Sequence, residues 1–344
     1  MESIATPESA ALKRPASQTL LFAGLGLGIA VLFVISLGLG TVHIPAARIF
    51  PALVASDNSP FAIIVQEIRL PRAILGALVG ASLGLSGAAL QGLLRNPLAE
   101  PAIIGTSSSA ALGAVVALYY GFAALTPLAL PLFAICGAVA ATMVLFALAG
   151  RDPGVLTIIL AGVALSSLTG ALISVAINLS PDPHASLEIV FWLLGSLSDR
   201  SMSHVWLVLP FMLVGWALLL RCGPALDALT LGEETAASLG FSLKRLRLAV
   251  VIGTALAVGA GVAVSGAIGF IGLVVPHLLR PLVGHRPGLL LPASAMGGAA
   301  LLLAADIGVR LMPTHAEFKL GVLTALLGAP FFLVLILNTR RRPL

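Results

Sequence analysis

The short run Gly269-Phe-Ile-Gly-Leu-Val-Val-Pro-His-Leu-Leu-Arg280 decides the fold, because it fixes how often the chain crosses a membrane. A spanning helix needs about 20 apolar residues, and this run is shorter and is interrupted by Pro276. It is therefore either a broken span or a re-entrant helix. Nine longer apolar runs accompany it, near residues 20–40, 71–94, 103–120, 126–149, 157–179, 202–220, 246–264, 289–310 and 318–338.

The distribution of basic residues favours a count that includes the short run. Cytoplasmic loops of membrane proteins carry an excess of Lys and Arg. With ten spans and a cytoplasmic N-terminus, 13 basic residues lie inside and 6 lie outside. With nine spans, the tail Arg340-Arg-Arg342 would face outward. We therefore predict an all-α integral membrane protein of about ten transmembrane helices, with both termini in the cytoplasm.

The composition agrees with a membrane protein and excludes several other classes. Of the 344 residues, 59% are hydrophobic and 10% are charged, and the mean hydropathy is +1.09, whereas soluble globular chains are about 25% charged. So apolar a chain offers no basic face for nucleic acid. Its two cysteines, Cys136 and Cys222, are too few for a disulfide framework. No lysine stands in a phosphate-binding loop, so we expect no ATPase site in this chain.

The apolar runs define one membrane domain over residues 20–338. Residues 1–19 form a cytoplasmic tail, because the apolar stretch that follows is longer than the core of a signal peptide, about 7–15 residues. Residues 221–247 form a cytoplasmic loop, and residues 339–344 form a basic tail. The stretches that begin at Pro101 and Pro287 resemble each other weakly, which suggests duplicated halves of the kind found in transporters.

Two polar motifs lie at the ends of the second predicted span. Arg69-Leu-Pro-Arg72 stands at its outer end, where two guanidinium groups could receive carboxylates from outside. Snorkelling to the interface is the alternative, but the positive-inside rule disfavours two outer arginines without a purpose. At the inner end, Asn96-Pro97 and Glu100-Pro101 break the helix twice. This elbow is either a connector or a gate.

The cytoplasmic loop contains a third motif, Asp227 to Gly240. Its apolar residues recur at helical spacing, and Gly240 stands where a helix C-terminal glycine is expected. A membrane-surface helix would carry lysines on its polar face, whereas this one carries Glu233 and Glu234. We therefore predict a short amphipathic helix that docks a cytoplasmic partner.

Together, six motifs resemble the FecCD family, the permease subunits of type II ATP-binding-cassette importers for haem, iron-siderophores and cobalamin. The motifs are Arg69-Leu-Pro-Arg72, Gln91 to Pro101, Leu160-Ala-Gly-Val-Ala164, Leu231-Gly-Glu with Leu239-Gly240, Gly266 to His277, and Leu326-Leu-Gly-Ala-Pro330. The resemblance covers residues 20–338. It implies a BtuC-like fold in the bacterial inner membrane, a homodimer, two cytoplasmic ATPase subunits that use ATP and Mg, and a periplasmic binding protein.

The resemblance also implies roles for individual residues. The residues that would dock the binding protein are Arg69, Arg72 and Arg310. Asp306 precedes Arg310 by four residues and could pair with it across one helical turn. Those of the cytoplasmic gate would be Asn96, Leu98, Val155, Leu156 and Thr157. Those that would couple to the ATPase are Gly232, Glu233, Glu234, Ala236, Ala237, Leu239 and Gly240.

Polar residues on otherwise apolar spans are the candidates for a translocation path: Ser82, Ser86, Gln91, Ser166, Ser174 and Asn178. The chain is most like haem-type members, ahead of siderophore and cobalamin members, although no residue decides the substrate. The six histidines show no helical i,i+4 pair, so we predict no metal site and no cofactor bound by this chain. An ion-coupled secondary transporter, the competing class, would need intramembrane carboxylates, and among the predicted spans only Asp306 is a candidate.

Overall fold

The computed structural model describes residues 16–40, 42, 44–55, 59–126, 128–150, 154–180, 183–312 and 318–340, and within these ranges the chain forms helices and loops without a strand. The helices in chain order are α1 (Ala16–Gly38), α2 (Ala46–Val54), α3 (Pro60–Ile63), η1 (Ile64–Arg69), α4 (Leu70–Leu94), η2 (Pro101–Ile104), α5 (Thr106–Tyr119), α6 (Phe122–Leu125), α7 (Ala129–Ala149), α8 (Val155–Asn178), α9 (Pro183–Leu193), α10 (Met202–Arg221), α11 (Gly223–Leu229), α12 (Glu233–Ser238), α13 (Leu243–Ser265), α14 (Ile271–Leu279), η3 (Pro281–Val283), α15 (Pro287–Leu311) and α16 (Leu320–Arg340).

Every predicted apolar run coincides with a helix, and the all-α membrane fold is confirmed. In the described part of the chain, seven helical segments are long and apolar enough to cross a membrane, and two shorter apolar stretches are Thr106–Tyr119, which is α5, and Leu320–Val334, which is part of α16. The run that decides the count forms α14, which has nine residues with Pro276 inside it. Such a helix is about 14 Å long, less than half the hydrocarbon thickness of about 30 Å. The total of ten spans therefore stays a prediction.

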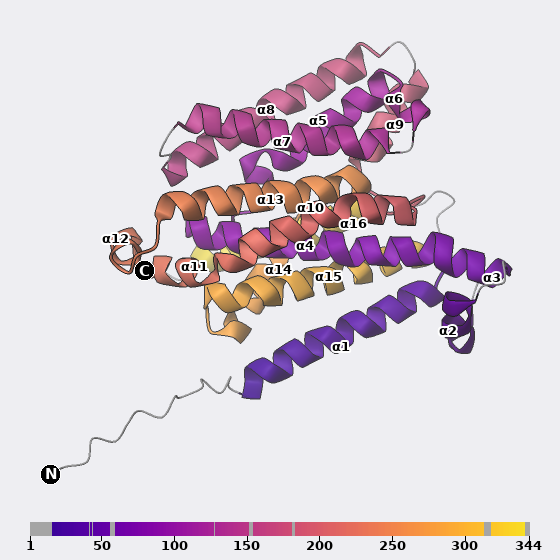
Figure 1. Cartoon of the computed structure of the whole chain (residues 1–344), viewed down its shortest axis with the longest axis horizontal. Helices are drawn as coiled ribbons and strands as arrows, with labels where there is room; N and C mark the ends of the chain where they lie inside the picture. Colours follow the sequence, from indigo (N-terminus) through magenta and orange to yellow (C-terminus); the bar gives the residue numbers. More distant parts are fainter. Residues whose placement is uncertain are drawn as a thin grey trace.

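Helix α4 runs through the centre of the bundle, between α13 and α15 (Figure 1). Small residues let it approach its neighbours closely, as expected for helix association in lipid. A Cβ atom added to Gly84 would lie 2.0 Å from the Ser294 carbonyl oxygen, and one added to Gly298 would lie 2.1 Å from the Gly80 carbonyl oxygen. The helices α4 and α15 thus meet backbone to backbone.

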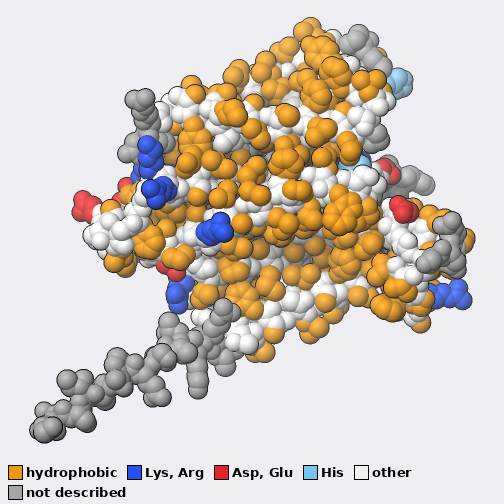
Figure 2. Space-filling model, in the orientation of Figure 1, with side chains coloured by type: hydrophobic (Ala, Val, Ile, Leu, Met, Phe, Trp, Pro, Cys, Tyr) orange, Lys and Arg blue, Asp and Glu red, His pale blue; other side chains and the backbone are white. Residues whose placement is uncertain are grey.

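The helices α5, α7 and α8 form a layer on one side of this centre (Figure 1). Helix α13 joins the layer to the centre, since it packs against both α7 and α4. Helix α8 is the most open of the three, with Leu156, Leu160 and Leu168 each at least 57% exposed. Apolar side chains cover the middle of the molecule, and most charged side chains on the visible face lie towards its two ends (Figure 2). This distribution is typical of a protein that spans a bilayer.

Candidate functional site

Arg69 lies inside the end of the bundle that carries α2. We call this end the outer end, because the positive-inside rule predicts that it faces outward. The residue is 4% exposed. Its Nη1 atom donates to the carbonyl oxygens of Leu37 at 2.8 Å and Gly38 at 2.7 Å, and its Nη2 atom donates to that of Val42. Leu37 and Gly38 lie in the last turn of α1, where backbone acceptors lack helical partners, and Val42 follows it. Arg69 therefore closes the C-terminal end of α1.

Arg72 and Arg310 share one carboxylate, that of Asp306. The Nη2 atom of each arginine lies 2.8 Å from an Asp306 oxygen, and the Asp306 side chain is 1% exposed. Arg72 also donates to the Ser198 hydroxyl at 2.9 Å, and Arg310 donates to the Ser36 carbonyl oxygen at 2.9 Å. This confirms the pairing expected between Asp306 and Arg310. Because its charge is neutralised by two cations, Asp306 is a poor candidate for a coupling-ion site.

This placement changes how the predicted docking arginines can be tested. All three guanidinium groups bind the chain itself, with Arg69 4% exposed and the side chains of Arg72 and Arg310 13% and 8% exposed. Their docking role stays a prediction. Reversing Arg69 and Arg72 to Glu would set new carboxylates against carbonyl oxygens and Asp306, and would weaken the fold together with any docking.

The elbow after α4 is a tight turn. Arg95 adopts a left-handed conformation with φ of 50°, and the Leu98 N–H donates to the Asn96 side-chain oxygen at 2.9 Å. Glu100 lies nearby, close to the backbone N–H of Phe270. Burial raises the pKa of the Glu100 carboxyl, and that N–H acts in the opposite direction. The structure therefore bears out a constrained turn, and its role as a gate stays a prediction.

The second predicted gate element begins α8, after residues that lie outside the described part of the chain. Val155 is half-buried, whereas Leu156 and Thr157 are exposed. Helix α8 then passes directly over η2, since a Cβ atom added to Gly162 would lie 2.3 Å from the Ile103 carbonyl oxygen. The elbow and the start of α8 thus belong to segments in backbone contact.

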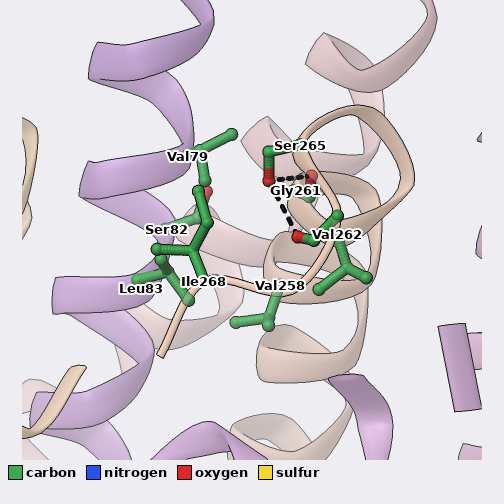
Figure 3. A pocket seen from close by; sticks show the side chains of 9 residues that line it. Val79, Ser82, Leu83, Val258, Gly261, Val262, Ser265 and Ile268 are labelled. Atoms are coloured by element: carbon green, nitrogen blue, oxygen red, sulfur yellow. Dashed lines mark hydrogen bonds between the residues drawn. The ribbon is translucent and has the colours of Figure 1, made fainter. Parts of the chain in front are cut away.

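The six residues predicted for the path lie on two helices, α4 and α8, and their role in a path stays a prediction. Ser82, Ser86 and Gln91 are buried in the helix bundle. Ser82 accepts a hydrogen bond at 2.9 Å from Trp216 Nε1 on α10. The crevice beside Ser82, between α4 and α13 (Figure 3), has no room for a water molecule.

The other three predicted path residues lie on α8, away from α4. Each bonds to a backbone oxygen: Ser166 to Ala102 at 3.3 Å, Ser174 to Gly170 at 3.0 Å, and Asn178 to Ser174 at 3.1 Å. The sequence pattern grouped the two sets because both are polar residues in apolar runs. It could not show that α4 is enclosed by its neighbours while α8 stays at the surface.

The predicted docking helix at the opposite, inner end is two helices, α11 and α12. The break falls at Gly232, whose φ of 111° is unfavourable for residues with a side chain. Gly240 follows α12 with φ of 88°, as the predicted C-terminal glycine should.

Ala236 is fully buried, whereas Leu231 and Leu239 are 67% and 59% exposed. Beside Ala236, α12 is tied to α13, because Glu233 pairs with Arg247 at 3.1 Å. Exposed leucines at the inner end agree with a docking surface.

We expect Ala236→Pro to separate ATP hydrolysis from transport. The Ala236 N–H donates to the Gly232 carbonyl oxygen at 3.0 Å, and proline removes this bond at a cost of about 3 kcal/mol in a helix interior. The membrane helices are not touched, so insertion should persist. Transport and partner ATPase activity are to be measured on the assembled complex, with Ala124→Ser, at an exposed alanine of α6 outside the predicted coupling residues, as the control. Retention of both activities would show that α12 is not a coupling element.

Within the described ranges, no three His, Cys, Asp or Glu side chains come together as a metal site. His43 and His315 lie outside those ranges. His204 bonds locally, since its Nδ1 atom lies 3.0 Å from the Ser201 hydroxyl. His277 contacts the ring of Phe331 edge-on, with centroids 5.7 Å apart.

Comparison with known proteins matches residues 28–338 to the FecCD transport family. The chain is 40% identical to the vitamin B12 import system permease protein BtuC of Klebsiella pneumoniae, over 99% of this chain and 100% of that one. It is 38% identical to the hemin transport system permease protein HmuU of Yersinia pestis, over 92% and 97%, and 41% identical to the uncharacterized ABC transporter permease protein YvrB of Bacillus subtilis, over 91% and 92%. A solved structure described as an inward-facing conformation of a metal-chelate type ABC transporter superposes with a TM-score of 0.83 at 34% identity, over 93% of this chain and 99% of that chain.

Proposed function

Because the chain belongs to the FecCD transport family and is an ABC importer permease, we propose that it carries haem or another iron chelate from the periplasm to the cytoplasm. Cobalamin is the second candidate, since relatives named for vitamin B12 import are as similar as the one named for hemin. Haem and cobalamin are both metal ions held in a tetrapyrrole ring. The observation that carries this proposal is the match to both kinds of permease over more than nine-tenths of the chain.

The side chains of the candidate path suit a bulky cargo that passes without being held. The polar groups of Ser166, Ser174 and Asn178 are already bonded to backbone oxygens. They therefore offer a large ligand few strong hydrogen bonds. A ferric siderophore, the third member of the substrate class, fits this argument as well as haem does, so the substrate has to be tested directly.

A second copy of the chain would complete the path. The exposed apolar faces of α8 and α16, including Leu156, Leu160, Leu326 and Leu333, support this pairing. A surface hollow of about 480 Å³ also lies along α16, and Leu193, Leu194 and Ala267 are among the residues that line it. In a symmetric pair the same faces meet each other, and two such hollows would make one channel.

The remaining partners would bind at the two ends. Two ATPase subunits, which supply the ATP and Mg chemistry, would dock on α11 and α12, where Leu231 and Leu239 are exposed. A periplasmic binding protein would dock on the outer end above the Asp306 cluster. With these partners, the protein would lie in the bacterial inner membrane.

Transport into proteoliposomes tests the proposal. The chain is to be reconstituted with its ATPase subunit and binding protein, and offered haem, a ferric siderophore and cobalamin in parallel. We expect ATP-dependent uptake of haem, and no ATP hydrolysis by the chain alone. Uptake of cobalamin only would replace haem with the second candidate. Hydrolysis by the chain alone, or uptake driven by an ion gradient without ATP, would contradict the proposal.

A further inference from the structure

A part-buried hydrogen bond between Gln91 and Arg280 links the inner end of α4 to the residue that follows α14. Gln91 is 2% exposed, and its Oε1 atom accepts a hydrogen bond from Arg280 Nη2 at 2.5 Å. The Nε2 atom of Gln91 donates to the carbonyl oxygens of Gly272 and Leu273, each at 3.4 Å. One side chain of α4 thus contacts both α14 and the arginine that follows it.

The two helices also touch directly. A Cβ atom added to Gly87 would lie 1.9 Å from the Gly272 carbonyl oxygen, so no side chain separates the two backbones at this point. A displacement of one helix must therefore move the other or break the contact, because packed interiors have little free volume.

From Arg280 the chain leads through a compact turn into α15. The His285 N–H donates to the Arg280 carbonyl oxygen at 3.0 Å, and α15 begins two residues later. There Asp227, from α11, accepts a hydrogen bond from the Gly288 N–H at 2.7 Å and lies 3.8 Å from Arg286 Nη2. A carboxylate at a helix N-terminus is favourable for both its hydrogen bond and its charge. Helix α11 is therefore joined to the start of α15.

Helix α11 also reaches the end of α4. A Cβ atom added to Gly92 would lie 3.4 Å from Leu226 Cδ2. Gly92 follows Gln91 directly, and the Asn96 N–H donates to the Gln91 carbonyl oxygen at 3.2 Å. The elbow is thus hydrogen-bonded to the turn of α4 whose residues Gln91 and Gly92 contact Arg280 and Leu226.

We propose that the Gln91–Arg280 pair and the Asp227 cap join α11, α14, the start of α15 and the end of α4 into one inner body, which moves the Asn96 elbow when the ATPase displaces α11 and α12. Gln91, Arg280 and Asp227 are positioning residues in this scheme. The scheme rests on the proposed function for its driving force, but the contacts that define the inner body belong to this chain alone.

Gln91→Leu tests the proposal, because leucine keeps most of the volume and removes every side-chain hydrogen bond of Gln91. In the reconstituted complex we expect the ratio of ATP hydrolysed to substrate imported to rise about tenfold, within the range that coupling residues affect. Gln91→Glu keeps an acceptor for Arg280 but loses the donor to Gly272 and Leu273, so it should restore the ratio in part. The control is Thr142→Val, which removes a hydrogen bond to the Ala138 carbonyl oxygen at 2.9 Å on α7, outside the inner body. A wild-type ratio in Gln91→Leu would overturn the proposal.

Hydrogen exchange on the purified chain provides a test that does not require a transported substrate. If the inner body exists, Gln91→Leu and Asp227→Ala should each speed amide exchange in the elbow, residues 95–105, although Asp227 lies on another helix. An unchanged rate of amide exchange in the elbow of Asp227→Ala would overturn the proposal, even if the complex that contains this variant transports normally. A wild-type complex that imports none of the three substrates, combined with faster elbow exchange in both variants, would contradict the proposed function and leave the inner body supported.

Discussion

Replacing Asp306 by Ala is expected to lower the free energy of unfolding by about 3–5 kcal/mol, the cost of removing one partner from a buried ion pair. Arg72 and Arg310 would both lose their carboxylate, at N–O distances that are now 2.8 Å. Both guanidinium groups would then stay buried without the counter-charge of Asp306. The free energy is to be measured by denaturant titration of the purified chain in detergent micelles.

One further variant separates charge from shape at this position, and a second variant elsewhere serves as the control. Asp306→Asn keeps the size of the side chain and an acceptor for the two arginines, so its loss should be smaller than that of Asp306→Ala. Glu188→Ala removes an exposed carboxylate and should change stability by less than about 0.5 kcal/mol. An Asp306→Ala chain as stable as this control would mean that the two arginines find other partners.

Replacing Gly298 by Ala is expected to disrupt the centre of the bundle, at a cost at or above the upper end of the 1–3 kcal/mol typical of overpacking. The added carbon would lie 2.1 Å from the Gly80 carbonyl oxygen, and backbone atoms cannot rotate away as a side chain can. Helices α4 and α15 would have to separate along their contact. Size-exclusion profiles and thermal melting of the purified chain are the measurements.

The matched control is Gly24→Ala on α1, where an added Cβ atom meets nothing within 4 Å. Alanine favours a helix over glycine by about 0.8–1.0 kcal/mol, so this change should be neutral or slightly stabilising. Equal melting temperatures for Gly298→Ala and Gly24→Ala would show that α4 and α15 are not in backbone contact.

Much of the fold was predictable because the signals are local. A helix that crosses a bilayer must be apolar along its whole length, so each predicted run coincides with a helix. The Asp306–Arg310 pair is also local, since residues four apart share one helix face, and the glycine after α12 ends that helix as expected. The boundary at Gly232 was missed because Leu231, Ala236 and Leu239 fit one continuous helical spacing.

The sequence by itself determined the class, the helical segments, the family and the residues that carry charge in an apolar chain. Only the tertiary structure decided which of them meet: Arg72 with Asp306, 234 residues apart, Gln91 with Arg280, 189 residues apart, and Arg69 with the end of α1. The reason is that a helix that is apolar on all sides does not mark its buried face. Which face of α4 or α8 is enclosed depends on neighbours that are distant in sequence, and the partners of the polar residues depend on that packing.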